Sequence, residues 1–260
     1  MSNHNQSVYT APGIVRHYQQ LKQLQPAEQV ILERFRDTLP QLKMLDIGVG
    51  GGRTTQHFAR LAQEYVGIDY SAAMIAACQR RFPHAALSVS LEIGDARTLT
   101  RFADNHFDFI LFSFNGLDYV SHGDRQQILQ TIHRVSKPGG YFYFSSHNLQ
   151  GIASTFDYRQ QLRLNPLNTY VNLVMTTLLW LCNPTLSHQK LSTAEYAIVR
   201  DESHNFRLQT YYIRPTAQLQ QLEPYFTDTE VYAWQTGRRL TADELTTNTD
   251  LWLYYLCRVK

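Results

Sequence analysis

The sequence predicts an α/β protein with a seven-stranded, mostly parallel sheet, helices on both faces and a helical insertion after the fifth strand. Three observations support this fold class. Strand and helix patterns alternate from residue 42 to residue 148, which is typical of a parallel sheet covered by helices. Phe107–Phe112 is an unbroken apolar run, as expected of a strand buried on both faces. Leu42–Ile47, also apolar, leads directly into a glycine-rich turn at residues 48–52.

The elements of the first half follow in order from apolar spacing and from the residues that begin or end helices. Pro26 is well placed at a helix start, Pro83 ends a helix, and Lys137-Pro-Gly-Gly closes another. Helices are expected at Ile14–Leu24, Ala27–Thr38, Arg53–Leu61, Ala72–Phe82 and Asp124–Val135, and strands at Leu42–Ile47, Glu64–Asp69, Leu87–Ile93, Phe107–Phe112 and Tyr141–Ser146.

The alternation breaks after Asn148, where residues 149–192 show no convincing strand. One helical face there carries six apolar residues, which predicts a helical lid: Val171, Val174, Met175, Leu178, Leu181 and Cys182. Beyond it, a helix is expected at Pro215–Leu222 and strand character appears at Glu195–Arg200, Arg207–Tyr212, Glu230–Trp234 and Leu251–Arg258. The chain is therefore divided into an N-terminal helical cover (1–39), a binding core (40–148), a helical lid (149–192) and a C-terminal part of the sheet (193–260).

Composition argues for an ordinary globular protein, with 43% hydrophobic and 18% charged residues in 260. The net charge of +2 gives no reason to expect nucleic acid or an anionic membrane as the main partner, although a local basic patch can hide in that average. The three cysteines lack metal-ligand spacing, and with no signal pattern at the N-terminus they favour the cytoplasm. Tyr170–Cys182 is too short to span a bilayer, but leaves room for a membrane-surface contact or a homodimer.

Acidic residues stand at the ends of three expected strands, namely Asp46, Asp69 and Asp95. Ligands of open α/β sheets bind at the carboxyl ends of the strands, so these carboxylates and the glycine turn predict a nucleoside pocket. A single aspartate at a strand end is usually a helix cap or turn former, but three in succession beside a glycine turn favour function. A dinucleotide is a poor alternative, because Arg53 replaces the third glycine of its fingerprint and Asp46 would repel a pyrophosphate.

These segments resemble the class I S-adenosylmethionine-dependent methyltransferases. The resemblance is carried by five pieces in the family's order: Leu45-Asp46-Ile-Gly48-Val-Gly50-Gly-Gly52, Gly67-Ile-Asp69-Tyr-Ser71-Ala-Ala-Met74, Gly94-Asp95-Ala96, Phe107-Asp-Phe-Ile-Leu-Phe and Val135-Ser-Lys-Pro-Gly-Gly140. Each piece is a weak signal alone, and the ordered set over residues 40–148 is strong. The resemblance implies a Rossmann-like fold, S-adenosylmethionine as cofactor and S-adenosylhomocysteine as product.

It also implies a role for each cofactor-binding residue. Glycines at the turn let the cofactor approach the backbone, and Asp46 attracts its ammonium. Asp69 accepts hydrogen bonds from the ribose hydroxyls, and Asp95 accepts from the adenine amino group. The remaining residues complete the site: Gly48, Gly50 and Gly52 in the turn, Tyr70 and Met74 flanking the adenine, the Ala96 N–H on a ring nitrogen, and Ser113 at the methionine end.

Catalysis has candidates after the fourth and fifth expected strands. His147 could be a general base at the catalytic edge, or it could turn the chain into the lid together with Asn148. Tyr119 is a second catalytic candidate. Substrate contacts are expected from Tyr18, Asn115, Asn148 and Tyr170, while Tyr9, His17 and Tyr18 could cover the sulfonium or simply pack a helix.

Several substrate classes are disfavoured. The stretch after the fourth strand reads Ser113-Phe-Asn115-Gly and lacks the Asn/Asp-Pro-Pro-aromatic tetrad of enzymes that methylate base or glutamine nitrogens. Asp118 and Asn148 are a thin basis for a metal site, so no metal is expected. The first hypothesis is methyl transfer to an oxygen or nitrogen of a small metabolite, without nucleic acid or a transmembrane segment. The alternatives are a macromolecular acceptor, RNA or protein, and a cofactor-binding scaffold without turnover.

Overall fold

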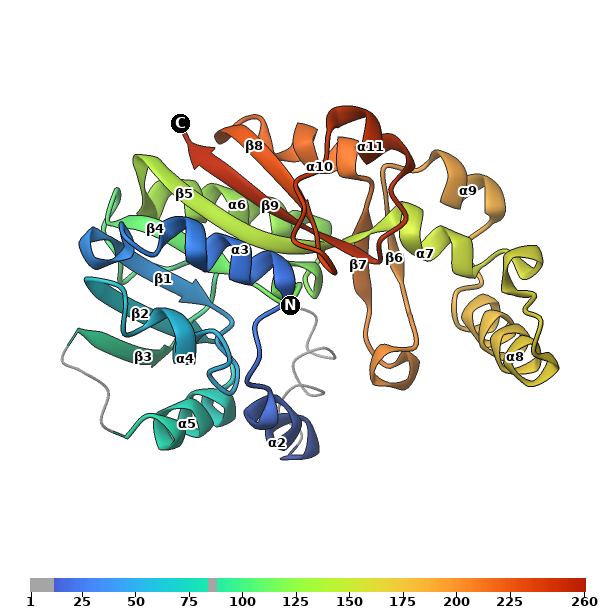
Figure 1. The fold of residues 1–260 in the computed structure, drawn as a ribbon, viewed down its shortest axis with the longest axis horizontal. Coiled ribbons are helices and arrows are strands. Elements are labelled where there is room, and N and C mark those ends of the chain that lie inside the picture. The colour runs from blue at the N-terminus through green and yellow to red at the C-terminus, as the bar shows by residue number, and fades with distance from the viewer. Residues whose placement is uncertain (1–11, 84–87) are drawn as a thin grey trace.

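The computed structural model describes residues 12–83 and 88–260, whose centre is a nine-stranded sheet (Figure 1). Seven strands run in the order β3-β2-β1-β4-β5-β7-β6, while β9 pairs with β5 and β8 pairs with β9. The strands are β1 Lys43–Ile47, β2 Glu64–Asp69, β3 Val89–Ile93, β4 Phe107–Phe112, β5 Ser136–Asn148, β6 Tyr196–Val199, β7 Thr210–Ile213, β8 Phe226–Ala233 and β9 Trp252–Val259.

The first five strands are parallel, as the alternating pattern predicts. Phe109, Ile110 and Leu111 of β4 have no exposed surface, because the sheet covers their edges and helices cover both faces. The parallel pairing brings the ends of β1, β2 and β4 to one edge of the sheet. That edge receives the glycine turn and the carboxylates expected to form the site.

The expected count of seven strands is wrong, because the β6–β7 hairpin joins the same sheet. β5 is 13 residues long, and its pairing with β4 ends at Phe144. The free end of β5 then pairs in parallel with β7, through His147 opposite Tyr212 and Asn148 opposite Ile213. Backbone groups along β5 that lack a β4 partner therefore find one in the hairpin.

The helices lie close to their expected positions, with one shortened element. The turn after β1 continues through Thr54, so the helix expected at Arg53–Leu61 is reduced to four residues. The Thr54 hydroxyl donates a hydrogen bond to Asp46, so this side chain points inward from the turn. The helices of the core are α2 Pro12–Gln20, α3 Pro26–Phe35, α4 Thr55–Phe58, α5 Ala72–Arg81, α6 His122–Val135, α10 Pro215–Leu222 and α11 Ala242–Thr247, with 3-10 turns at Leu39–Gln41, Gly116–Asp118 and Ser203–Phe206.

The insertion after β5 is helical, as expected, and has its own small core. It contains α7 Leu149–Thr155, a 3-10 turn at Tyr158–Gln161, α8 Pro166–Cys182 and α9 His188–Thr193. Leu149, Ile152, Phe156, Leu179 and Leu191 pack against residues of the β6–β7 hairpin. The insertion consequently sits at one end of the molecule, beyond the hairpin (Figure 1).

The apolar face predicted for this helix points outward. On α8 the buried residues are Thr176 and Leu179, whereas Val171, Val174, Leu178 and Leu181 are exposed. Periodicity identified the apolar stripe, but could not tell which side of the helix the rest of the protein would cover.

Candidate active site

A cavity of about 160 Å³ opens at the carboxyl edge of β1, β2 and β4. Its walls come from the turn after β1, the end of β2, the turn after β3 and the loop after β4. Of the predicted site residues, the lining includes Tyr18, Asp46, Gly48, Gly50, Asp69, Tyr70, Met74, Asp95, Ala96, Ser113 and Tyr119. The segments whose order indicated a nucleoside pocket therefore meet around one cavity.

The glycine turn is built from residues in the left-handed region. Gly48 and Gly50 have φ of 72° and 52° and line the cavity, so their bare backbone forms part of its wall. Gly52 also has positive φ, but it does not line the cavity. A Cβ on Gly52 would lie 2.5 Å from the Phe82 ring and 2.8 Å from Cys78 Sγ. The structure thus places Gly52 against α5, where it allows close packing.

Asp69 ends β2 and is fixed by two backbone donors. Its Oδ2 accepts from the Gly50 N–H at 3.0 Å and its Oδ1 from the Ser71 N–H at 2.8 Å. The residue is 6% exposed and lines the cavity. Burial raises the pKa of Asp69 to about 6, because the two backbone hydrogen bonds offset only part of the lost hydration. The site therefore presents a rigid acceptor pair, with lone pairs left for a ligand's hydroxyl groups.

Asp46 lies deeper, at 1% exposure, below the glycine turn. Its Oδ2 accepts from Thr54 Oγ1 and from the Tyr65 hydroxyl, both at 2.6 Å. Burial raises the pKa of Asp46 to about 7 despite these donors. A cationic ligand group in the cavity would favour the ionised form, which fits the expected attraction of an ammonium.

Asp95 is closely associated with Arg97, a contact that the sequence did not suggest. Arg97 donates from Nε at 3.0 Å to both carboxylate oxygens and from Nη2 at 2.6 Å to Oδ2. Burial alone would raise the pKa of Asp95, but the hydrogen bonds and charge of Arg97 lower it below the ordinary value. The predicted contact with an adenine amino group would have to share this carboxylate with Arg97.

A buried ion pair lies beside the methionine end of the predicted site. Arg53 lines the cavity and donates from Nη2 to Glu28 Oε1 at 2.7 Å and to Ser113 Oγ at 3.3 Å. Burial alone would raise the pKa of Glu28, but Arg53 lowers it below the ordinary value. Sequence reasoning used Arg53 only to reject a dinucleotide and missed its place in the wall. Its position directly after the glycine turn could have indicated that it lies in the wall of the cavity.

The loop after β4 is strained where it borders the cavity. Phe114 and Asn115 both adopt positive φ, 58° and 61°, which is costly for residues with a Cβ. The Phe114 ring lies 4.8 Å from the guanidinium of Arg53, and the Asn115 N–H donates to Ser145 Oγ at 2.7 Å. Asn115 Oδ1 is buried and has no hydrogen-bond partner within residues 12–83 and 88–260. The loop thus holds an unused acceptor next to two lining residues, Phe114 and Gly116.

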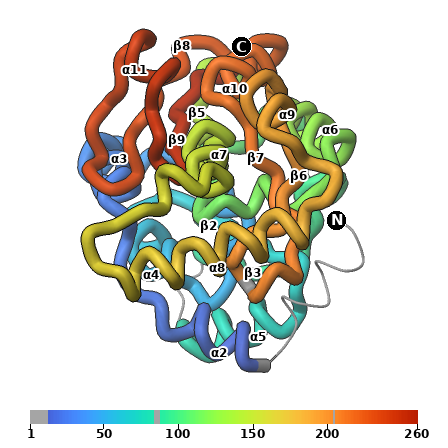
Figure 2. Tube along the Cα trace, turned by 90° about the vertical axis from the view of Figure 1, so that its right-hand side faces the viewer, coloured from blue at the N-terminus to red at the C-terminus, as the bar shows by residue number. Residues whose placement is uncertain are grey.

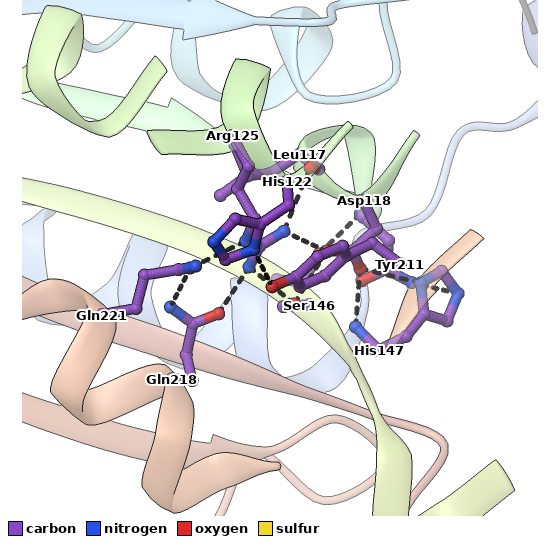
Figure 3. A network of polar contacts seen from close by, with 11 residues as sticks. Leu117, Asp118, His122, Arg125, Ser146, His147, Tyr211, Gln218 and Gln221 are labelled. Atoms are coloured by element: carbon purple, nitrogen blue, oxygen red, sulfur yellow. Dashed lines mark hydrogen bonds and ion pairs between the residues drawn. The ribbon is translucent and has the colours of Figure 1, made fainter. Parts of the chain in front are cut away.

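His147 and Asp118 form a buried pair behind this loop (Figure 3). His147 Nδ1 lies 2.8 Å from Asp118 Oδ2, which also accepts from the His147 backbone N–H at 2.6 Å. Since a carboxylate only accepts, Nδ1 carries the proton and Nε2 holds the lone pair. Nε2 lies 3.2 Å from Asn115 Nδ2, and the Tyr119 ring meets the imidazole edge to face at 6.2 Å. His147 is therefore one layer behind the lining residue Tyr119.

Arg125 supports the pair from the other side of Asp118 (Figure 3). The Arg125 side chain has no exposed surface, and it donates to Asp118 Oδ1, to Ser146 Oγ at 3.0 Å and to the Leu117 carbonyl at 3.0 Å. Gln218 and Gln221 of α10 accept its remaining hydrogen bonds. This arrangement orients the imidazole and places a cation beside Asp118. Sequence reasoning considered Asp118 only as a metal ligand and did not identify Arg125, because the contacts with His147, Ser146 and Gln218 join residues 21 to 93 positions apart.

Two predicted substrate residues lie away from the cavity. Asn148 caps α7 through a bond from the Gln150 N–H at 2.9 Å, and its Nδ2 donates to the Asn248 carbonyl at 3.0 Å. It has the chain-turning role that the sequence left open. Tyr170 is 66% exposed on α8, and no residue of the insertion lines the cavity. Of the expected sulfonium cover, Tyr18 lines the cavity, His17 is exposed on α2, and Tyr9 lies outside the described residues.

Replacing Arg125 with leucine is expected to lower the free energy of unfolding by about 3–5 kcal/mol, because Asp118 would keep a buried charge without its cation. Urea denaturation followed by circular dichroism measures the loss. Arg238→Leu is the matched control, since Arg238 pairs with Glu244 on the surface and such pairs contribute little. Equal losses in the two variants would show that the buried network does not stabilise the fold.

Comparison with known proteins places this geometry in a class. Residues 44–140 match the family described as a methyltransferase domain. The demethylmenaquinone methyltransferase of Renibacterium salmoninarum is 34% identical over 102 residues, covering 39% of this chain and 40% of that protein. The ubiquinone biosynthesis O-methyltransferase of Pseudomonas syringae pv. tomato is 30% identical over 113 residues, covering 44% and 47%. The matched stretch therefore spans less than half the length of these relatives.

The whole fold is shared with solved methyltransferases. The crystal structure of an S-adenosylmethionine-dependent methyltransferase from Mesorhizobium loti has a TM-score of 0.60 at 16% identity, covering 89% of this chain and 97% of that one. Residues 44–140 therefore match a methyltransferase domain, and the sheet around them has the Rossmann-like fold of an S-adenosylmethionine-dependent methyltransferase. S-adenosylmethionine is the cofactor of that class.

The residues of the cavity suit this cofactor. Asp69 offers a fixed carboxylate for ribose hydroxyls, Asp46 offers a carboxylate that gains from a cation, and Gly48 and Gly50 leave backbone bare where a Cβ would stand. Within the described ranges, no cluster of three histidine, cysteine or acidic side chains has the arrangement of a metal site. Asp118 is ion-paired with Arg125 and Asn148 caps a helix, so neither is available as the metal ligand considered from the sequence.

The affinity for S-adenosylmethionine is expected to fall as the pH drops below about 7, by up to about 10³-fold near pH 5. The pKa of Asp46 is about 7 and that of Asp69 about 6, and the contacts expected of both groups need their ionised forms. Binding therefore favours deprotonation, and protonation of the free site at low pH opposes binding. Isothermal titration calorimetry over this range measures the change. Asp69→Asn should remove the part of the profile near pH 6 and keep the part that Asp46 sets near pH 7, and a pH-independent wild-type affinity would contradict the proposed contacts.

Proposed function

We propose that the protein transfers the methyl group of S-adenosylmethionine to an oxygen or nitrogen of a small metabolite. The observation that carries the proposal is the continuity of the cavity. It runs from Asp69 and the glycine turn to Tyr119, directly in front of the Asp118–His147 pair. A cofactor site and a candidate proton acceptor thus lie at the same edge of the sheet.

The acceptor has to lose a proton when it is methylated, and His147 is the proposed base. Asp118 accepts the Nδ1 proton, which leaves the lone pair on Nε2 and stabilises the imidazolium that forms when Nε2 takes up a proton. The side-chain amide of Asn115 lies against His147 Nε2 in this structure. It has to rotate before the methyl acceptor can reach Nε2. Its unpaired Oδ1 offers a hydrogen-bond acceptor for the incoming O–H or N–H group.

Positioning by the chain accounts for the rest of the chemistry. When bound, S-adenosylmethionine supplies an activated methyl group on a sulfonium. Tyr18, Phe114 and Tyr119 line the cavity, where aromatic faces favour a cation and exclude water. Alignment of two bound reactants is worth up to about 7–11 kcal/mol of barrier in favourable cases. The residues named here align the acceptor and receive its proton.

A small acceptor is supported by the two relatives described above. They are named for demethylmenaquinone and for ubiquinone biosynthesis. Those matches cover 39% and 44% of this chain, so they support a small-molecule class and no particular compound. The net charge of +2 offers little attraction for RNA.

The proposal is tested by incubating the purified protein with methyl-labelled S-adenosylmethionine and a cell extract, then separating low-mass compounds from macromolecules. Label in a low-mass product supports the proposal, and its mass identifies the acceptor. Label on RNA or protein would replace the acceptor class while leaving the cofactor in place. Binding without any label transfer would instead favour the scaffold alternative.

A further inference from the structure

An apolar stripe runs along the solvent side of α8 and is not used by the fold. α8 is 17 residues long, about 25 Å. Six of its side chains recur at spacings of three and four residues and are exposed: Leu167 (67%), Tyr170 (66%), Val171 (49%), Val174 (39%), Leu178 (37%) and Leu181 (70%). We call these six residues the outer face of α8. Single exposed apolar residues are ordinary, but a contiguous stripe of this length marks an interaction surface.

Hydrogen bonds hold the opposite side of α8 against the protein, so the outer face remains exposed to solvent. Thr176 Oγ1 donates to the Thr155 carbonyl at 2.9 Å, and Trp180 Nε1 donates to the Phe156 carbonyl at 3.0 Å. Asn183, at the end of the helix, bonds to Arg200 at 2.8 and 2.9 Å. In the view onto this end of the molecule, α8 crosses in front of the neighbouring elements (Figure 2).

The surroundings of the outer face are apolar and positively charged. The loop before α8 adds Leu162 and Leu164, which are 61% and 105% exposed. Residues 158–194, which Asp157 and Glu195 flank, contain no aspartate or glutamate. Arg159 and Arg163, between α7 and α8, are exposed, as is Lys190 on α9. A helix with an apolar face, exposed aromatic and aliphatic side chains and basic neighbours fits the interface of a membrane rich in anionic lipid.

We infer that the outer face of α8 docks on the surface of an anionic phospholipid bilayer, with the helix lying parallel to the membrane plane. The apolar side chains would enter the boundary between headgroups and acyl chains, while Arg159, Arg163 and Lys190 contact the phosphates. Within the described residues no helix has the length and hydropathy needed to cross a bilayer, so the contact is peripheral.

Charge decides between this partner and a second copy of the chain. Two outer faces packed together would bring basic residues from both copies close to one another, with no acidic residue in the segment to compensate them. Anionic headgroups neutralise the same residues. The overall charge of +2 is too small for electrostatic binding by the whole surface, so the segment has to account for any membrane affinity. The inference is independent of the proposed methyl transfer.

Flotation of the full-length protein with phospholipid vesicles tests the inference. Wild type is expected to float with mixed phosphatidylcholine–phosphatidylglycerol vesicles and to bind pure phosphatidylcholine about 10-fold more weakly. The double variant Leu167→Glu/Leu181→Glu should lose at least about 10-fold in partitioning, because both changes place charge in the apolar stripe. Arg159→Gln/Arg163→Gln should remove most of the preference for anionic lipid. Val30→Glu, at a 39% exposed position of α3, is the control and should bind as wild type does.

Circular dichroism and S-adenosylmethionine binding establish that each variant is folded, and the arginine variant provides a test that leaves the apolar stripe unchanged. Wild type that stays with the soluble fraction in the presence of anionic vesicles would overturn the inference. So would vesicle binding that Leu167→Glu/Leu181→Glu leaves intact. A concentration-dependent dimer that this double variant dissociates, without vesicle binding by wild type, would assign the outer face to contact between copies.

Discussion

Replacing Asp69 with alanine is expected to weaken S-adenosylmethionine binding by at least about 100-fold. The expectation follows from two ligand hydroxyls that would lose a charged acceptor, since hydrogen bonds to charged groups contribute about 1.5–3 kcal/mol each. The Gly50 and Ser71 N–H groups would also lose their partner, so the turn that lines the cavity would be less rigid. Isothermal titration calorimetry at neutral pH gives the ratio of the two dissociation constants.

The matched control is Asp104→Ala. Asp104 pairs with Arg134 on the surface, and its side chain is 67% exposed. It should leave the affinity unchanged, and Asp69→Asn should fall between wild type and Asp69→Ala, because an amide can still accept one hydrogen bond. An unchanged dissociation constant for Asp69→Ala would mean that the cofactor does not bind at the end of β2.

Replacing His147 with asparagine is expected to lower kcat by about 10²–10⁴-fold, the range typical of a lost general base. The dissociation constant of S-adenosylmethionine should stay within about 3-fold, since His147 does not line the cavity. The measurement combines steady-state kinetics on the labelled acceptor with calorimetric cofactor binding. A lowered kcat with unchanged binding would separate the acceptor side of the site from the cofactor side.

His106→Asn is the control for this change, because His106 lies near Glu64 and at the opposite end of β4 from the site. Asp118→Asn tests the same idea through the partner residue, provided that denaturation shows the variant to be folded. It should lower kcat and alter the pH–rate profile, because Nδ1 would lose its charged acceptor. Retention of full kcat by His147→Asn would assign the base to another residue, with Tyr119 the next candidate.

The parallel half of the fold could be predicted because its signals are local. The apolar run of β4 and the glycine turn after β1 each identify an element without knowledge of its neighbours. The expected number of seven strands was wrong, because the number of strands in a sheet depends on which of them pair. β7 joins the sheet only through the last two residues of β5. The side on which α8 exposes its apolar face could not be predicted, for a related reason. A helical stripe shows where apolar residues lie, but tertiary packing decides which side is buried.

The candidate site also has parts that the sequence predicts and parts that it does not. Asp46 and Asp69 lie at the ends of β1 and β2 and Gly48 directly follows β1, so their convergence on one edge could be inferred from topology alone. The Asp118–His147 contact joins residues 29 positions apart, and no rule of sequence spacing predicts it. Gly52 shows a packing role that the motif did not indicate, since a Cβ there would meet Phe82 and Cys78, and its contact with the cofactor stays a prediction.

The most direct test of the proposed activity is the release of S-adenosylhomocysteine. Purified protein, S-adenosylmethionine and the low-mass fraction of a cell extract are incubated, and the product is counted per protein molecule. Methyl transfer to a small metabolite predicts many turnovers with wild type, at least about 100-fold fewer with His147→Asn, and none without the low-mass fraction. Tight binding of S-adenosylmethionine with at most one product per protein molecule, in every fraction supplied, would contradict an enzymatic role.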